Sequence, residues 1–279
     1  MGRHDDALEG IGPTGADLEE LLELALAAAE AGAAVLRGRD AERLGVSGKS
    51  GPGDWVTRFD VAAEQAVLRA VLERRPHDTV TGEESGTHRP EHPSGIRWSV
   101  DPLDGTTNFI RGIVYYCTSV AAADAQGNWL VGAVNAPALR RTYYAVRGAG
   151  AWLDEDGTVR RLEGPAPGRP GRIYGTGFSY DPALRERQFD TFLDSMRHYT
   201  DLRRIGSAAL DLCMVADGTL DGYAEQGLHE HDWAAGALVA EEAGALVTRP
   251  ALPSPADGPV PADERLAAWI TARERGIPG

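Results

Sequence analysis

The sequence predicts an α/β (α+β) fold, and three features of the chain support this prediction. Between Asp17 and Gly38, leucine and alanine recur at helical spacing with glutamates between them, which indicates an amphipathic helix. The apolar runs 113–123 and 129–135 flank a turn sequence at 126–128 and predict a β-hairpin. Toward the C-terminus, strand patterns alternate with helix patterns. Helices and strands mixed in this way are expected to pack in layers around a common core.

The first part of the chain is predicted to contain a leader, two helices and a strand. Residues 1–15 are polar and rich in glycine without periodicity, and we expect a disordered leader there. Asp60 is expected to be the N-cap of the second helix, at 61–74. A strand at 79–81 then runs into Gly-Glu-Glu, where Glu83 lies either in a solvated turn or at a corner that carries ligands.

The stretch Trp98–Gly112 reads WSVDPLDGTTNFIRG and is the most informative part of the chain. Alternating apolar residues lead up to Asp101 and predict a strand. Pro102 fixes φ and lacks an N–H group, so we expect the strand to end at this Asp-Pro pair. Gly105 gives the backbone freedom for a sharp turn, and Thr106 is a favourable residue at the start of a helix.

Asp101 and Asp104 lie on either side of this corner, so that their carboxylates can converge on one spot. Hard divalent cations favour oxygen ligands of this kind. The free N–H groups at the start of a helix suit a phosphate. A pair of metal ions beside a phosphate cradle is suited to the hydrolysis of a phosphate ester.

The same stretch has other interpretations. It fits an ordinary turn in which aspartate is a cap and glycine a turn residue. A calcium EF-hand loop requires acidic residues at alternate positions and a distant glutamate, and this spacing does not meet that requirement. The stretch also resembles slightly the haloacid-dehalogenase phosphatases, which use D-x-D at a strand end with the first aspartate as nucleophile. Here the spacing is D-x-x-D, which weakens that interpretation.

Strands and helices are expected to alternate in the second half of the chain. The segment 154–172 is rich in glycine, proline and charge, and it is the predicted boundary between two halves, 16–153 and 154–279. The last pattern, at 266–272, fits a strand or a helix. Predicted strands lie at 141–146, 150–152, 173–176, around 201–205, 220–225 and 246–248, and predicted helices at 182–197, 208–216 with Ser207 as cap, and 233–243 with Asp232 as cap.

Charge and composition narrow the class of protein. A net charge of −14 over 279 residues argues against a nucleic-acid backbone or an anionic membrane as partner. Cys117 and Cys213 lie in apolar surroundings, which predicts buried free thiols in a reducing compartment. No signal-peptide pattern and no uninterrupted apolar run of membrane-spanning length is found, and we expect a cytoplasmic enzyme.

Five motifs in register resemble those of the inositol monophosphatase family. The string Asp101–Phe109, DPLDGTTNF, is the most specific of them. Taken together, the motifs cover roughly residues 17–248. The other four are Gly53-Asp54-Trp55-Val56-Thr57 with Asp60, Glu83 after Gly82, Gly206-Ser207-Ala208-Ala209-Leu210, and Asp232 followed by Ala234-Ala235-Gly236.

The resemblance implies a layered αβαβα sandwich of the inositol monophosphatase and fructose-1,6-bisphosphatase type. It also implies a homodimer and a lithium-sensitive phosphatase that uses two or three Mg²⁺ ions per subunit. The N-terminal half would carry most metal ligands, and the C-terminal half Asp232 and the residues that decide substrate specificity. By this resemblance, the first metal is held by Glu83, Asp101 and the carbonyl of Leu103, the second by Asp101, Asp104 and Asp232, and a weaker third shares Glu83.

The catalytic and substrate-binding roles are likewise implied by the resemblance. Thr106, hydrogen-bonded to Asp60, would orient the attacking water, with Glu83 as the third catalytic residue. A substrate hydroxyl would bond to Glu225. The remaining substrate contacts would come from Asp104, the N–H groups of Gly105 and Thr106, and the N–H of Ala208.

One position departs from the family pattern. The family usually has tryptophan immediately before the aspartate at position 232, whereas this chain has His231 there and Trp233 on the other side. His229 and His231 lie two residues apart and can face the same way. We expect a changed packing residue at the rim of the pocket, rather than an additional contact to a transition metal or a phosphate. The departure bears on the identity of the substrate more than on the chemistry.

The predicted function is the Mg²⁺-dependent hydrolysis of a small polyol or sugar phosphate by direct attack of metal-activated water. Inositol-1-phosphate is the expected substrate, because the Thr107-Asn108-Phe109 tail resembles the inositol phosphatase branch, whereas sulfonucleotide phosphatases usually carry Lys-Glu-Phe. Fructose-1,6-bisphosphate and histidinol phosphate are alternative substrates. Two further alternatives are a phosphatase with Asp101 as covalent nucleophile and a non-catalytic protein that binds a phospho-ligand.

Overall fold

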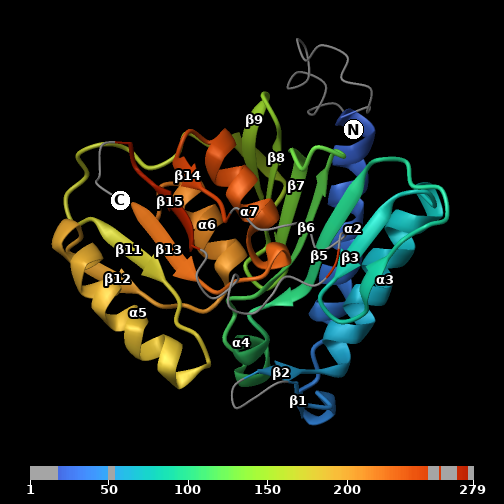
Figure 1. The fold of residues 1–279 in the computed structure, drawn as a ribbon, viewed down its shortest axis with the longest axis horizontal. Coiled ribbons are helices and arrows are strands. Elements are labelled where there is room, and N and C mark those ends of the chain that lie inside the picture. Colours follow the sequence, from blue (N-terminus) through green and yellow to red (C-terminus); the bar gives the residue numbers. More distant parts are fainter. Residues whose placement is uncertain (1–17, 50–53, 251–257, 259–268, 276–279) are drawn as a thin grey trace.

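The protein is built from five layers of alternating helices and sheets, as Figure 1 shows for the computed structural model. The structure describes residues 18–49, 54–250, 258 and 269–275. In Figure 1 the layers run from α5 on the left, through a small sheet, the helices α6 and α7, and a large sheet, to α2 and α3 on the right. The predicted αβαβα sandwich is therefore confirmed. The predicted leader, residues 1–15, lies outside the described residues.

The large sheet has eight strands in the order β10-β9-β8-β7-β6-β5-β3-β4. Its neighbouring strands are antiparallel except for β3 and β5, which are parallel and therefore end at the same edge. The bounds of its strands are β3 Thr79–Gly82, β4 Gly86–His88, β5 Arg97–Asp104, β6 Cys117–Ala123, β7 Trp129–Ala136, β8 Arg141–Val146, β9 Gly150–Glu155 and β10 Thr158–Arg161.

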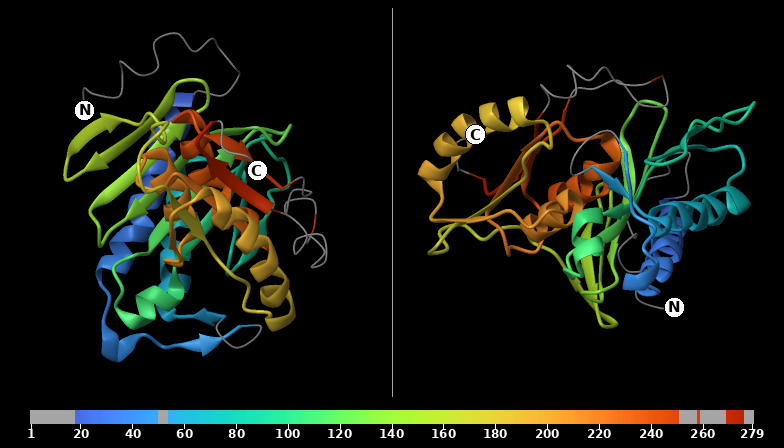
Figure 2. Two further views of the ribbon diagram at one scale, coloured as in Figure 1. Left: turned by 90° about the vertical axis from the view of Figure 1, so that its left-hand side faces the viewer. Right: turned by 90° about the horizontal axis from the view of Figure 1, so that it is seen from below.

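Two antiparallel helices, α2 (Leu18–Arg37) and α3 (Arg58–Arg74), cover the outer face of the large sheet (Figure 2). The apolar face of α2 is buried against this sheet, as its leucine and alanine spacing predicts. A two-stranded ribbon, β1 (Ser47–Gly48) and β2 (Trp55–Val56), and a short 3₁₀ turn (Ala41–Arg43) connect the two helices. Among the described residues, no helix is long and apolar enough to cross a bilayer.

The small sheet has five strands in the order β12-β11-β13-β15-β14. The ambiguous pattern at 266–272 is resolved as a strand, β15, which pairs antiparallel with both β13 and β14. The bounds are β11 Ile173–Thr176, β12 Asp201–Arg203, β13 Gly222–Gln226, β14 Leu246–Thr248 and β15 Trp269–Arg273.

The helices α6 (Ala208–Ala216) and α7 (Glu230–Glu242) fill the space between the two sheets. Their small and apolar residues form one buried core with both sheets, and this core includes Cys213 and Cys117 as free thiols, as predicted. Helix α5 (Pro182–Ser195), which is followed by a 3₁₀ turn (Met196–His198), covers the outer face of the small sheet.

Several predicted boundaries are wrong, and each has a local cause. Helix α3 begins before Asp60, because Thr57 is the N-cap and Asp60 is the third helical residue of a capping box. Helix α7 likewise begins before Asp232, with His229 as N-cap. Strand β5 does not end at Asp101-Pro102 but continues to Asp104 through an irregularity in its pairing with β6.

The segment 154–172 also contains a strand that was not predicted. Strand β10 pairs with β9 and completes the large sheet, so that the chain passes from one sheet to the other between Arg161 and Ile173. Strand β9, Gly150–Glu155, runs across the proposed boundary. The division into two halves at residue 154 stays a prediction.

Candidate metal centre and active site

Strands β3 and β5 bring Glu83 and Asp101 together. Because the two strands are parallel, the turn after β3 lies beside the end of β5, and the N–H of Glu83 donates to the carbonyl of Val100 at 3.2 Å. The carboxyl groups of Glu83 and Asp101 are within hydrogen-bonding reach of one another. Glu83, which the sequence left open between a solvated turn and a ligand corner, therefore lies at a corner that faces Asp101.

The irregular end of β5 holds the second part of the centre. The side chain of Asp101, which is 2% exposed, accepts a hydrogen bond from the N–H of Leu103 at 3.0 Å. The carbonyl of Pro102 accepts from Thr118 Oγ1 at 2.9 Å. These contacts interrupt the regular pairing with β6, and they hold the chain from Asp101 to Asp104 in one fixed path.

A sharp turn at Gly105 starts the short helix α4 (Thr106–Arg111). Gly105 has a φ of 97°, and a Cβ there would lie 2.9 Å from the carbonyl oxygen of Tyr115, so that only glycine fits. The hydroxyl of Thr106 lies 3.1 Å from Asp60 Oδ1 and 3.0 Å from the Leu103 carbonyl oxygen, and its single proton can be donated to either acceptor. The predicted hydrogen bond between Thr106 and Asp60 is therefore present.

Asp104 is held by the N-terminus of α6. Its Oδ2 accepts hydrogen bonds from Ser207 Oγ and from the N–H of Ala209, each at 2.7 Å. The helix N–H that bonds this carboxylate is therefore that of Ala209. Ala208 begins α6 beside it, and its own role toward a substrate stays a prediction.

Asp232 lies in the first turn of α7, and its carboxylate accepts from the N–H of His229 at 2.5 Å. Its charge acts on Asp101 and Asp104, which places the three carboxyl groups in one cluster. Glu225, at the end of β13, accepts from Tyr223 Oη at 2.6 Å and acts electrostatically on Asp104 and Asp232. The small sheet thus contributes one carboxylate to the rim of the centre.

The electrostatics of this cluster show an excess of negative charge. Burial and then the charge of Glu83 raise the pKa of Asp101 well above its usual value, and burial and then Asp232 do the same for Asp104. Burial, followed by the charge of Glu83, raises the pKa of Asp232 to about 8. Burial alone would raise the pKa of Glu83 as well, but His231 and Lys49 lower it. The cluster therefore needs more positive charge than the protein supplies.

The residues at this corner fit a divalent cation. Apart from the imidazole nitrogen of His231, their donors are carboxylate and carbonyl oxygens, the ligands that hard divalent cations prefer. Glu83, Asp101 and His231 each offer a ligand atom, and these three atoms lie within 4.8 Å of one another. The donor set and the uncompensated charge both agree with the predicted metal site, whose individual ligand assignments stay predictions.

Two residues that the sequence prediction missed support the turn that carries Glu83. Glu64, which is buried on α3, accepts hydrogen bonds from the N–H groups of Glu84 and Ser85 at 2.8 and 2.7 Å. Lys49 donates to Glu83 Oε1 at 2.7 Å and also forms an ion pair with Glu84. The only sequence signal for Glu64 was its place one helical turn after Asp60.

A pH dependence of stability follows from the raised pKa of Asp232. Because this pKa lies above that of an unfolded aspartate, the stabilisation from the protonated group is complete below about pH 4 and is lost as pH rises through about 8. In the presence of a chelator, the Tm is expected to fall by about 5–10 °C between about pH 6 and about pH 8. Thermal unfolding followed by circular dichroism checks this.

Two controls accompany the measurement. Millimolar Mg²⁺ is expected to flatten the dependence of Tm on pH, because a bound cation stabilises the ionised carboxylates. Asp232→Asn is expected to weaken the dependence without metal, because the amide does not ionise, while Asp101 and Asp104 keep their own raised pKa values. A Tm of the metal-free wild type that stays constant over this pH range contradicts the expectation.

The fold and the site define a class of protein: a five-layer α/β sandwich with a cluster of carboxyl groups, a candidate cation centre, at the end of a parallel strand pair. A model of the Inositol monophosphatase family matches residues 17–272, and the chain belongs to this family. Inositol-1-monophosphatase SuhB of Mycobacterium tuberculosis is 43% identical over 237 residues, which cover 79% of this chain and 80% of the relative.

Two further comparisons agree with this assignment. A solved structure of Mycobacterium tuberculosis SuhB superposes with a TM-score of 0.75 at 36% identity, covering 93% of this chain and 92% of the other. A relative named Nus factor SuhB, from Pasteurella multocida, is 40% identical over 195 residues, covering 70% of this chain and 71% of the relative. The similarity at the level of the fold thus extends over both sheets.

Proposed function

We propose that this protein is a Mg²⁺-dependent phosphomonoesterase that acts on a small polyol or sugar phosphate. The observation that carries the proposal is the convergence of Glu83, Asp101, Asp104 and Asp232, from three separate segments, on one corner of the fold. Inositol-1-phosphate is the proposed substrate, because the mycobacterial relative is named an inositol-1-monophosphatase. A homodimer and inhibition by lithium are part of the same proposal.

Mg²⁺ would be held by Glu83, Asp101, Asp104, Asp232 and the Leu103 carbonyl. Bound there, it would make water more acidic and neutralise charge on the phosphate. The four carboxylates alone would repel a phosphate ester. They can therefore fix the place of substrate binding only when cations are bound to them. The N–H groups of Gly105 and Thr106 are proposed to hold phosphate oxygens.

Thr106 and Asp60 are proposed to position the attacking water. Since the Thr106 hydroxyl donates its proton toward Asp60, its oxygen lone pairs are free to accept a hydrogen bond from water. Asp60 is fully buried and is held by the N–H and the hydroxyl of Thr57. Glu225, fixed by Tyr223, is proposed to accept a hydrogen bond from a hydroxyl of the substrate.

The test is a panel of phosphate esters assayed for released phosphate, with and without Mg²⁺. The panel contains inositol-1-phosphate, fructose-1,6-bisphosphate and histidinol phosphate. The expected result is hydrolysis only with Mg²⁺ and the highest kcat/KM for inositol-1-phosphate. Preference for one of the other two esters changes the substrate and leaves the chemistry in place. Tight substrate binding without turnover at millimolar Mg²⁺ would show instead a binding protein.

The stereochemical course at phosphorus separates direct attack by water from covalent catalysis. With a substrate whose phosphate is made chiral by oxygen isotopes, direct attack is expected to invert the configuration at phosphorus, whereas an aspartyl-phosphate intermediate, which requires two displacements, would retain it. Trapping of an aspartyl-phosphate on Asp101 would support the covalent alternative, in which that carboxylate is the nucleophile.

A further inference from the structure

The histidine that departs from the family pattern lies against the metal centre. His231, in the first turn of α7, Glu83, after β3, and Asp101, on β5, offer three ligand atoms within 4.8 Å of one another. These residues come from three different elements and include one nitrogen donor and two carboxylates. Because it combines an imidazole nitrogen with carboxylate oxygens, this group differs from a cluster that contains only acidic side chains.

The imidazole of His231 is held in place beside these carboxylates. Its side chain is 11% exposed, and its ring stacks on that of His229, with centroids 5.1 Å apart and planes 5° from parallel. Its Nε2 lies 3.7 Å from Asp232 Oδ1, a separation longer than a hydrogen bond. Packing therefore fixes the ring, while this nitrogen is not engaged by the neighbouring aspartate.

The ligand type decides which cation such a group prefers. Mg²⁺ favours oxygen ligands and near-ideal octahedral geometry, whereas imidazole nitrogen suits Zn²⁺ and other divalent transition metals. A catalytic zinc site typically has three protein ligands, drawn from histidine, aspartate, glutamate and cysteine, and one open position. Glu83, Asp101 and His231 supply three ligands of these types.

We infer that His231 is a metal ligand and that, with Glu83 and Asp101, it makes one of the cation sites selective for a divalent transition metal such as Zn²⁺. The inference rests on the proposed function, because two of its three ligands belong to the proposed Mg²⁺ centre. It reverses the expectation from the sequence, in which His231 was a packing residue at the rim. The cation bound between Asp101, Asp104 and Asp232 would remain Mg²⁺, since that side offers only oxygen.

The test compares metal binding by the full-length metal-free protein and its variants. Zn²⁺ and, separately, Mg²⁺ are titrated into wild type, His231→Ala and His231→Trp by isothermal calorimetry. Both variants are expected to bind Zn²⁺ at least about tenfold more weakly than wild type, with a smaller change for Mg²⁺. Alanine and tryptophan differ in size, so that if one variant does not fold, the Zn²⁺ affinity of the other can still be compared with that of wild type.

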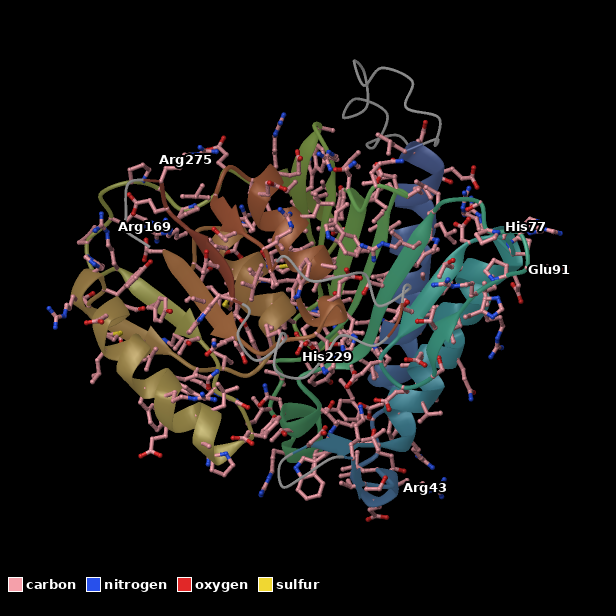
Figure 3. All side chains as sticks on the ribbon, viewed as in Figure 1. Arg43, His77, Glu91, Arg169, His229 and Arg275 are labelled. Carbon is pink, nitrogen blue, oxygen red and sulfur yellow. The ribbon has the colours of Figure 1, made fainter. Side chains whose placement is uncertain are left out.

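His77→Ala controls for the adventitious binding of Zn²⁺ to surface histidines. His77 is exposed and lies at the far right edge of the molecule in Figure 3, whereas His229, two residues before His231, lies near the centre of the view. His77→Ala is expected to bind Zn²⁺ as tightly as wild type. Equal Zn²⁺ affinity of wild type and both His231 variants would overturn the inference.

A spectroscopic signature distinguishes ligation from a structural effect. Pulsed electron paramagnetic resonance of the Mn²⁺-loaded protein is expected to show a ¹⁴N coupling in wild type and in His77→Ala, and none in His231→Ala. A ¹⁴N coupling that persists in His231→Ala would also overturn the inference.

Asp101→Asn separates failure of this inference from failure of the proposed function. If this variant loses Mg²⁺ and Zn²⁺ binding while His231→Ala retains both, the carboxylate centre stands and the histidine ligand is rejected. If Asp101→Asn binds both metals like wild type, the proposed metal centre itself is wrong.

Discussion

Asp101→Asn is expected to lower Mg²⁺-dependent phosphatase activity by at least roughly 10²–10³-fold. Asp101 is buried close to the carboxyl groups of Glu83, Asp104 and Asp232, and its carboxylate is proposed to contact two cations. Replacing this carboxylate by an amide removes negative charge at the place where both cations are proposed to bind. Without metal, the same variant is expected to have a higher Tm than wild type at pH 8, because the amide replaces a buried carboxyl group whose ionised form is disfavoured by burial and by its acidic neighbours. Phosphate release and thermal unfolding with a chelator measure these two effects.

The opposite direction of the two effects excludes a folding defect as the cause of lost activity. Asp156→Asn is the matched control. Asp156 lies in an exposed turn at a φ of 53°, a conformation that asparagine tolerates well, and it is expected to retain wild-type activity and Tm. Full Mg²⁺-dependent activity in Asp101→Asn would show that the proposed metal mechanism is wrong.

Glu64→Ala is expected to weaken both activity and stability, although Glu64 itself is not proposed to touch substrate or metal. Its carboxylate holds the N–H groups of Glu84 and Ser85, and thereby the turn that carries Glu83. Loss of an orienting partner typically costs about 10–100-fold in metal affinity or activity, and two partly buried N–H groups left without an acceptor cost about 1–3 kcal/mol. Mg²⁺ calorimetry, kcat and urea unfolding measure these quantities.

Two further variants show whether the effect of Glu64→Ala arises at the turn. Glu64→Gln keeps one acceptor oxygen and is expected to recover part of the Mg²⁺ affinity. Glu73→Ala removes an exposed carboxylate from the same helix and is expected to match wild type in both assays. A Glu64→Ala protein that is destabilised but binds Mg²⁺ normally would show a structural role only.

The sequence predicted helices and strands correctly where the pattern that defines them lies within a short stretch of the chain. Helix α2 and helix α6 with its Ser207 cap match their predicted positions, because spacing and capping residues are properties of a few adjacent residues. Strand β10 was missed because its residues, Thr158–Arg161, are mostly exposed at the end of the sheet and lack an apolar pattern. The starts of α3 and α7 were misplaced because aspartate, a common N-cap, is here the third residue of a capping box.

The sequence by itself determined the identity of the donors and the local turns that present them: Asp101 and Asp104 around a proline, and Gly105 where only glycine fits. Only the tertiary structure decided which donors meet. Glu83 reaches Asp101 through the parallel pairing of β3 with β5, and Asp104 is held by a helix more than a hundred residues further along the chain. The position of His231 against Glu83 and Asp101 was likewise set by the packing of α7 between the two sheets. Contacts of this range depend on how whole layers pack, and short-range spacing carries no information about that packing.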